Sequence, residues 1–147
     1  GQMFDKAGPD LDYVPSNNGD FATALIAPCG ATSVSLDFSV FDLNANANLK
    51  IYDGVNALGT PLHSGNGFSA GDDPASIGTL TASTGTMYLL WNSTAGATAD
   101  GFAATWSSVA GTGAAPTSSF TIPASILYNS VYVDFFNTST IHKREIS

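Results

Sequence analysis

The chain has 147 residues, of which 44% are hydrophobic and only 11% are charged, and its formal net charge is −8. The length is enough for one domain of ordinary size, or for one domain plus part of another, and the hydrophobic content argues against intrinsic disorder. The acidic balance disfavours nucleic acid and anionic membrane surfaces as partners. No apolar run approaches the length of about 18 residues that a membrane-spanning helix needs.

Alternation of apolar and polar residues predicts an all-β fold, because helical periodicity is almost absent. In "TSVSLDFSV" (32–40), Val34, Leu36, Phe38 and Val40 are expected to face one way and the polar residues the other. The predicted strands cover 22–27, 32–40, 48–52, 76–82, 87–91 and 101–107. Turn sequences separate them, and many short strands with frequent turns favour an antiparallel β-sandwich.

The composition changes at 110–118, where small residues and proline predict a linker after a first domain over 1–109. Two further strands are predicted at 119–122 and 131–136, within an incomplete segment over 119–147. Two strands cannot bury a core of their own, so they pack on the first domain or begin a domain that this chain does not finish. The tail at 141–147 is open to three interpretations: a linker, a flap or a vector remnant.

No catalytic motif stands out, and we do not expect an enzyme. The sequence has neither a metalloprotease helix motif nor a nucleophile elbow, and no residue pattern nominates His63 or His142 as a catalytic base. Cys29 has no internal disulfide partner, and its place after an apolar run predicts a buried, inert thiol rather than one paired between chains.

Residues 3 to about 108 resemble a CUB domain of the disulfide-free bacterial variety. The resemblance rests on "MFDKAGPDLDY", "VSLDFSVFDL", "LKIYDG", "LHSGNG", "PASIGTLTASTGTMYLLWNS" and "GFAATW" in that order. It implies a jelly-roll-like β-sandwich. Residues of about 115–140, with "APTSSFTI" and "VYVDFFNTST", resemble the opening strands of a PKD-type Ig-like domain. Such tandem modules imply a secreted or cell-surface bacterial protein, many of which use type IX secretion.

The CUB resemblance also implies a calcium site at one end of the sandwich, but most of its carboxylates are replaced here. Tyr13 fits the supporting tyrosine, whereas Asn44 stands for the corner glutamate, Ala47 for the middle aspartate, and Asn92 or Thr94 for the third acidic ligand. Calcium takes six to eight oxygens and prefers carboxylates. The weak calcium candidates that remain are Asp42, Asn44 and Asp53.

Three functions follow from these observations. The first is a non-catalytic binding or adhesion module that contacts protein or glycan through loops at the sandwich end. Its predicted ligand-binding residues are Tyr13, Asn44, Asn46, Asn92 and Thr94, together with Phe68 as an exposed loop aromatic. The second is a structural spacer or filament subunit that self-associates by adding its C-terminal strands to a neighbour. The third is a calcium-binding CUB domain; no other cofactor is expected.

Overall fold

A computed structural model describes residues 1–8, 10–14, 19–94, 96–113, 120–121 and 136–137. The chain divides into two compact units, Gly1–Gly111 and Thr112–Ser147, which are described separately. Within the described residues, no helix is long and apolar enough to cross a membrane.

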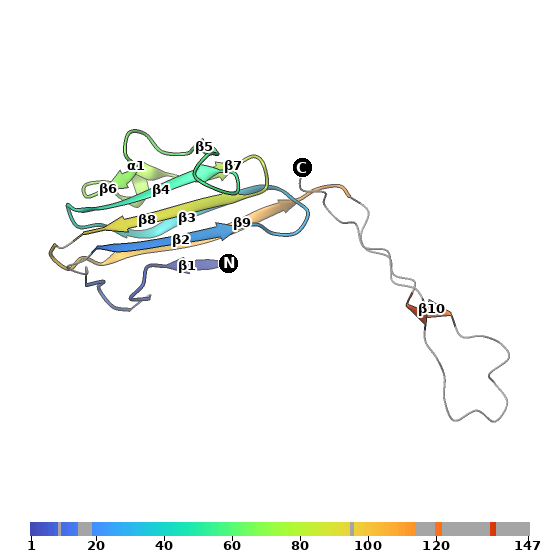
Figure 1. Cartoon of the computed structure of the whole chain (residues 1–147), viewed down its shortest axis with the longest axis horizontal. Coiled ribbons are helices and arrows are strands. Elements are labelled where there is room, and N and C mark those ends of the chain that lie inside the picture. Colours follow the sequence, from blue (N-terminus) through green and yellow to red (C-terminus); the bar gives the residue numbers. More distant parts are fainter. Residues whose placement is uncertain (9, 15–18, 95, 114–119, 122–135, 138–147) are drawn as a thin grey trace, which may run out of the picture. The chain divides into compact units, whose positions relative to one another are not determined.

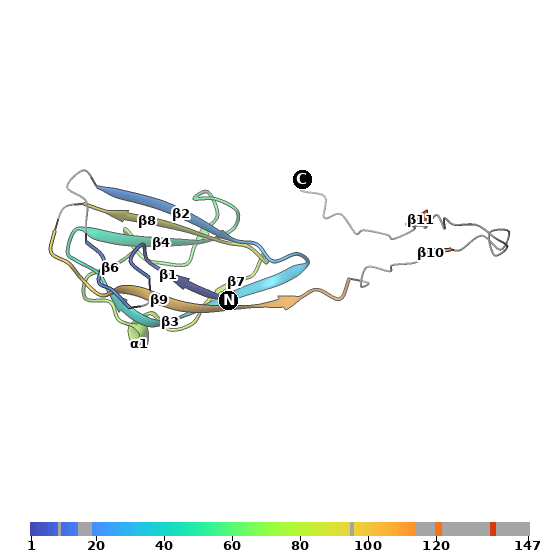
Figure 2. The same cartoon turned by 90° about the horizontal axis from the view of Figure 1, so that it is seen from below.

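The first unit is a β-sandwich of two antiparallel sheets (Figures 1 and 2). One sheet has the order β1 (Gln2–Phe4), β9 (Gly101–Ala110), β3 (Ala31–Asp42) and β7 (Leu80–Ala82). The other has the order β2 (Asp20–Ile26), β8 (Met87–Ser93), β4 (Ala47–Asp53) and β5 (Thr60–Pro61), and β6 (Phe68–Ser69) also pairs with β4. The all-β sandwich prediction is confirmed, while its jelly-roll connectivity stays a prediction.

The core lies between the sheets and is built from alternate residues of the long strands. On β8, Met87, Leu89 and Trp91 are buried while the residues between them are more exposed. The sequence of 87–91 is apolar on both faces and predicts a central strand covered on both sides. β8 does lie between β2 and β4, but Tyr88 and Leu90 are only half-buried. The remaining large core side chains come mainly from β3, β4 and β9: Val34, Leu36, Phe38, Phe41, Leu49, Ile51 and Phe102.

The alternation along β3 is interrupted by a bulge, so the expectation that Val40 faces inward is wrong. The register against β9 shifts between Phe38 and Val40. A bulge adds one residue to one strand and so reverses which side chains face inward beyond it. Phe41 is therefore buried, while Val40 is 38% exposed.

The predicted strand at 76–82 begins too early. Residues Pro74–Ile77 form the short helix α1, and the strand β7 covers only Leu80–Ala82. Asp73 caps the helix, because its carboxylate accepts a hydrogen bond from the backbone N–H of Ser76 at 2.7 Å while the Ser76 hydroxyl receives one from the Asp73 N–H. This capping box, followed by proline at the first helical position, is a helix-start signal that the strand interpretation missed.

Cys29 is exposed, and the prediction of a buried thiol is wrong. It lies in the turn between β2 and β3, where Ala31 N–H donates to the Pro28 carbonyl at 3.1 Å and Gly30 has a φ of 70°. The turn carries the thiol away from the core, since the last inward-facing residue of β2 is Ile26.

In the second unit, β10 (Phe120–Thr121) pairs with β11 (Phe136–Asn137) in an antiparallel ladder. Most of the predicted C-terminal features lie outside the described residues: the linker at 114–118, the strand residues 131–135, His142 and the tail at 141–147.

Candidate functional site

Four of the predicted ligand-binding residues come together at one end of the sandwich, where β3 leads into β4 and β8 ends. Asn44 N–H donates to the Tyr13 hydroxyl oxygen at 3.0 Å. The Asn46 carbonyl accepts from the Thr94 N–H at 3.2 Å. The sequence therefore identified a real cluster of contacts, although Tyr13 and Asn44 are 31 residues apart in the chain.

Tyr13 and Asn44 are buried, and their polar atoms are engaged within the protein. Tyr13 is 0% exposed, and its ring packs edge-on against Trp91 with the centroids 5.3 Å apart. The Asn44 side chain accepts from the Asn46 N–H at 2.8 Å and donates to the Ala97 carbonyl at 3.3 Å. These bonds hold the loop after β3 in place, so both residues serve the scaffold of this end.

The other predicted residues of this end are exposed. Asn46 follows the buried Asn44, Thr94 follows β8, and Asn92 lies on β8 opposite Phe21 and Asn48. These three side chains reach the surface around a hydrogen-bonded loop, and they remain the predicted contact residues of the sandwich end.

Phe68 is not an exposed loop aromatic, and that expectation is wrong. It lies on β6, pairs with Leu49 of β4 and is half-buried. Its ring lies edge-on to Phe41, with centroids 6.2 Å apart, and it packs against the core. Bonding to β4 turns the side chain inward because Leu49, its register partner, also faces the core.

The three calcium candidates do not form one site. Asp42 and Asn44 are at the end of β3, whereas Asp53 is at the far end of β4, seven residues along an extended strand of about 20 Å. Asn44 already uses its side-chain oxygen on the Asn46 N–H. Within the described ranges no three His, Cys, Asp or Glu side chains are grouped closely enough to hold a metal.

Asp53 instead anchors the turn between β7 and β8. Its carboxylate accepts from the N–H and hydroxyl of Ser83, at 2.7 and 2.8 Å, and from the N–H and hydroxyl of Thr84. Partial burial alone would raise the pKa of Asp53, but these hydrogen bonds to the charged form together lower the pKa below its ordinary value.

A cleft of about 380 Å³ opens between the edge strands β1 and β2, and we call it the β1–β2 cleft. Figures 1 and 2 show β1 in the layer opposite β2 and beyond its outer edge. The cleft is lined by Met3, Phe4, Asp5, Lys6, Asp20, Phe21, Ala22, Thr23, Ala24, Leu49, Leu89, Trp91 and Phe102. It therefore reaches the core side chains Leu49 and Leu89 from the side of the sandwich.

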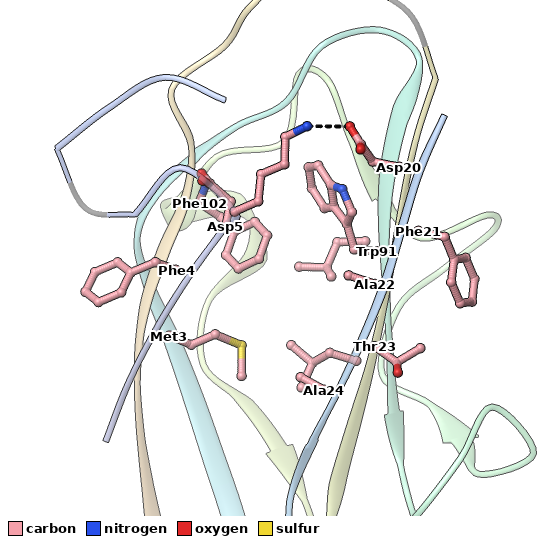
Figure 3. A pocket seen from close by; sticks show the side chains of 13 residues that line it. Met3, Phe4, Asp5, Asp20, Phe21, Ala22, Thr23, Ala24, Trp91 and Phe102 are labelled. Carbon is pink, nitrogen blue, oxygen red and sulfur yellow. Dashed lines mark hydrogen bonds and ion pairs between the residues drawn. The ribbon is translucent and has the colours of Figure 1, made fainter. Parts of the chain in front are cut away.

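Small and large side chains alternate along the β2 wall of this cleft. Ala22 and Ala24 point into it, towards Met3, while Phe21 and Thr23 point away (Figure 3). Phe21 is 71% exposed and Leu25 is 50% exposed on the outer face. The cleft exists because alanine fills little of the space that larger residues would occupy between the sheets.

Asp5 fixes the β1 wall to β9. Its N–H donates to the Phe102 carbonyl at 3.1 Å, and its carboxylate accepts from the Phe102 N–H at 3.0 Å and from the Ala7 N–H at 2.7 Å. The carboxylate fits only because residue 101 is glycine: a Cβ there would lie 1.6 Å from the Asp5 Oδ2, and Gly101 has a φ of 80°. The floor of the cleft at Phe102 is thereby held rigidly.

An ion pair crosses one end of the cleft. The Lys6 ammonium lies 2.6 Å from a carboxylate oxygen of Asp20, so the segment after β1 is joined to the start of β2 (Figure 3). Both partners are partly exposed, and such pairs contribute little to stability.

The lining of the cleft is mostly apolar. Trp91, Phe102, Met3 and the two alanines supply hydrocarbon, while the Asp5 carboxylate is committed to backbone N–H groups. The residues that line it include neither a histidine nor a cysteine.

No model of a known protein family matches this chain, and no curated protein matches it.

The β1–β2 cleft was not predicted from the sequence because it depends on β1, a strand without a clear sequence signal. β1 is three residues long and carries no clear alternation, and its place beside β9 comes from a contact about one hundred residues away in sequence. One signal was available: in the strand "DFATALI", alanine occupies the positions that face the same way as the buried Ile26. Small residues on the inner face of an edge strand indicate that the space between the sheets is incompletely filled at that edge.

Proposed function

We propose that this chain is a non-catalytic binding module of a secreted or cell-surface protein, and that it binds an extended segment of a partner protein along the β1–β2 cleft. The resemblance of residues 3–108 to bacterial CUB domains supports the general assignment. The observation that carries the proposal is the free edge of β2 directly beside an apolar cleft that reaches Trp91 and Phe102.

The main chain of β2 is available for pairing on its outer side. β2 ends the order of its sheet, and its ladder to β8 is continuous from Asp20 to Ile26. Among the described residues, no backbone hydrogen bond joins Phe21–Leu25 to anything except β8. An unpaired edge supplies a row of donors and acceptors that an added strand satisfies.

A protein ligand fits this surface better than a glycan. Glycans need polar groups around an aromatic stacking face, whereas here Trp91 and Phe102 are buried and the nearby Lys6 and Asp20 are paired with each other. A strand paired with β2 places every second side chain over the cleft. The exposed Asn46, Asn92 and Thr94 lie at the same end of the sandwich and can extend the contact.

A random peptide library displayed on phage tests this proposal. We expect wild-type protein to enrich peptides with large apolar residues at alternate positions. Ala24→Trp, which fills the cleft, is expected to weaken their binding at least about tenfold, or 1.4 kcal/mol. Ala57→Trp adds the same side chain in an exposed turn and is the matched control.

Hydrogen exchange supplies a second measurement on the same peptides. Binding along β2 should slow exchange of backbone amides within Phe21–Leu25 and leave β5 unaffected. Peptides that bind Ala24→Trp as well as they bind wild type, or the enrichment of no peptide, would contradict the proposal. Loss of peptide binding in an Asn46→Ala and Thr94→Ala variant alone would move the site to the sandwich end.

A further inference from the structure

The chain itself contains a segment suited to the β1–β2 cleft. We propose that residues 131–135, "VYVDF", of a second copy of this chain pair with the free edge of β2 and insert side chains into the cleft. This inference rests on the proposed function, because it names the partner strand for the same site, and it makes the module self-assembling.

The β1–β2 cleft and the β2 edge, which form the acceptor in this proposal, leave room for one added strand. β1 extends beyond the outer edge of β2 in the opposite layer, so a strand added to β2 would lie over β1 (Figures 1 and 2). The side chains of Met3 and Ala24 point towards that space from its two walls (Figure 3). The cleft volume of about 380 Å³ equals the share of roughly a dozen liquid waters, enough for several apolar side chains.

The β2 edge carries almost none of the features that prevent strand addition. Natural edge strands are usually protected by lysine, proline, bulges or short length. Residues Phe21–Ile26 contain no charge and no proline, and their register against β8 has no shift. Phe21 and Leu25 also expose large apolar side chains on the outer face, next to which an added strand would pack its own.

The proposed donor has the matching pattern. Val131, Val133 and Phe135 alternate with Tyr132 and Asp134, so one face of an extended strand is wholly apolar. Five residues equal the length of the uncharged β2 edge from Phe21 to Leu25. With the valines and Phe135 turned inwards, Asp134 faces solvent and its charge is not buried.

The segment belongs to the second unit, whereas the cleft belongs to the first. Among the described residues of the second unit, Phe120–Thr121 pairs with Phe136–Asn137, and a two-stranded ladder buries little apolar surface by itself. A second copy offers the cleft at the same concentration as the segment. The inserted segment and the cleft are different surfaces of the chain, so the contact between two copies is heterologous. Further copies can therefore add in the same way and extend the assembly.

The test combines one variant that blocks the segment with one that blocks the cleft, both in the full chain. Val133→Asp places a charge on the inserted face, and Ala24→Trp fills the acceptor. By size-exclusion chromatography with light scattering, wild type should grow beyond its 15.1 kDa monomer as concentration rises. Each variant alone should remain monomeric at every concentration.

Mixing the two variants gives the decisive measurement. The Ala24→Trp copy retains a working segment and the Val133→Asp copy retains a working cleft, so an equimolar mixture should form a species of twice the monomer mass and nothing larger. Val55→Asp, at an exposed valine in the turn after β4, and Ala57→Trp are matched controls that should assemble as wild type does.

Wild-type protein that remains monomeric would overturn the inference, and this includes the case in which the segment inserts into the cleft of its own copy. A mixture of the two variants that stays monomeric would also overturn it. Assembly that survives Ala24→Trp would overturn it as well, by placing the contact elsewhere. Peptides from the phage library that bind wild type but not Ala24→Trp would still support the proposed function, so the two proposals fail separately.

Discussion

The two lateral sides of the sandwich are closed in different ways. On the side of β5 and β6, Leu62, Phe68 and Ile77 from the excursion between β4 and β8 pack against the core. On the side of β1 and β2, short or small residues leave the β1–β2 cleft. The same rule of alternation builds both edges, so the difference comes from what covers them. The covered edge is closed by side chains from the excursion between β4 and β8, and the uncovered edge is where we propose that a partner adds a strand.

The largest expected change in the free energy of unfolding comes from a substitution that tests whether side chains fill the covered side. Phe68→Ala should lower the free energy of unfolding by about 3 kcal/mol, since it opens a cavity beside Phe41. Met3→Ala should cost only about 1 kcal/mol, because its neighbours already border an open cleft. Urea denaturation measures both, with Leu58→Ala at a highly exposed position as the control. Equal costs for Phe68 and Met3 would remove the distinction between the sides.

A second prediction concerns the clamp that holds the open side in shape. Gly101→Ala forces a methyl group against the Asp5 carboxylate and strains a backbone with φ of 80°, so we expect a loss of about 2 kcal/mol. Gly113→Ala is the control, because nothing lies within 4 Å of its added Cβ and its φ is not positive. An unfolding free energy like that of wild type in Gly101→Ala would show that Asp5 does not anchor β1.

A third prediction concerns how the stabilising effect of Asp53, on the covered side, depends on pH. The pKa of Asp53 is lower in the folded state than in the unfolded state. Asp53 therefore contributes to the free energy of unfolding above the unfolded-state pKa of about 3.9, and this contribution is lost as the pH falls through the folded-state pKa. Asp53→Asn should therefore cost about 1 kcal/mol at neutral pH and less in acid. Urea titrations at neutral and acidic pH check this, with the exposed Asp10→Asn as control. A cost that grows in acid would contradict it.

The smallest expected effect is on the open side. Ala24→Trp adds a large side chain where space exists, so the free energy of unfolding should change by less than about 1 kcal/mol in either direction. Thermal melts would detect a larger change. A melting temperature lowered as far as in Phe68→Ala would mean that the β1–β2 cleft is not available to an inserted side chain.

Local sequence patterns were enough to predict the fold class and to place several residues at one end of the sandwich. Alternation in "TSVSLDFSV" located β3 within two residues at each end, and the run at 87–91 identified a central strand. These predictions succeed because side chains alternate along any extended strand whatever its partners are. Tyr13, Asn44, Asn46 and Thr94, which were expected at one end of the sandwich, lie together there, whereas their role in ligand binding stays a prediction.

The remaining features depend on contacts between segments that are distant in the sequence. The bulge before Val40 reverses the facing of β3, and it arises from pairing with β9, more than sixty residues away. Phe68 turns inward because β4 pairs with it, and Asp53 binds Ser83 and Thr84 across a distant turn. The β1–β2 cleft lies between segments that join only on folding. Local patterns determine which way a residue can face, whereas long-range pairing determines what it meets there.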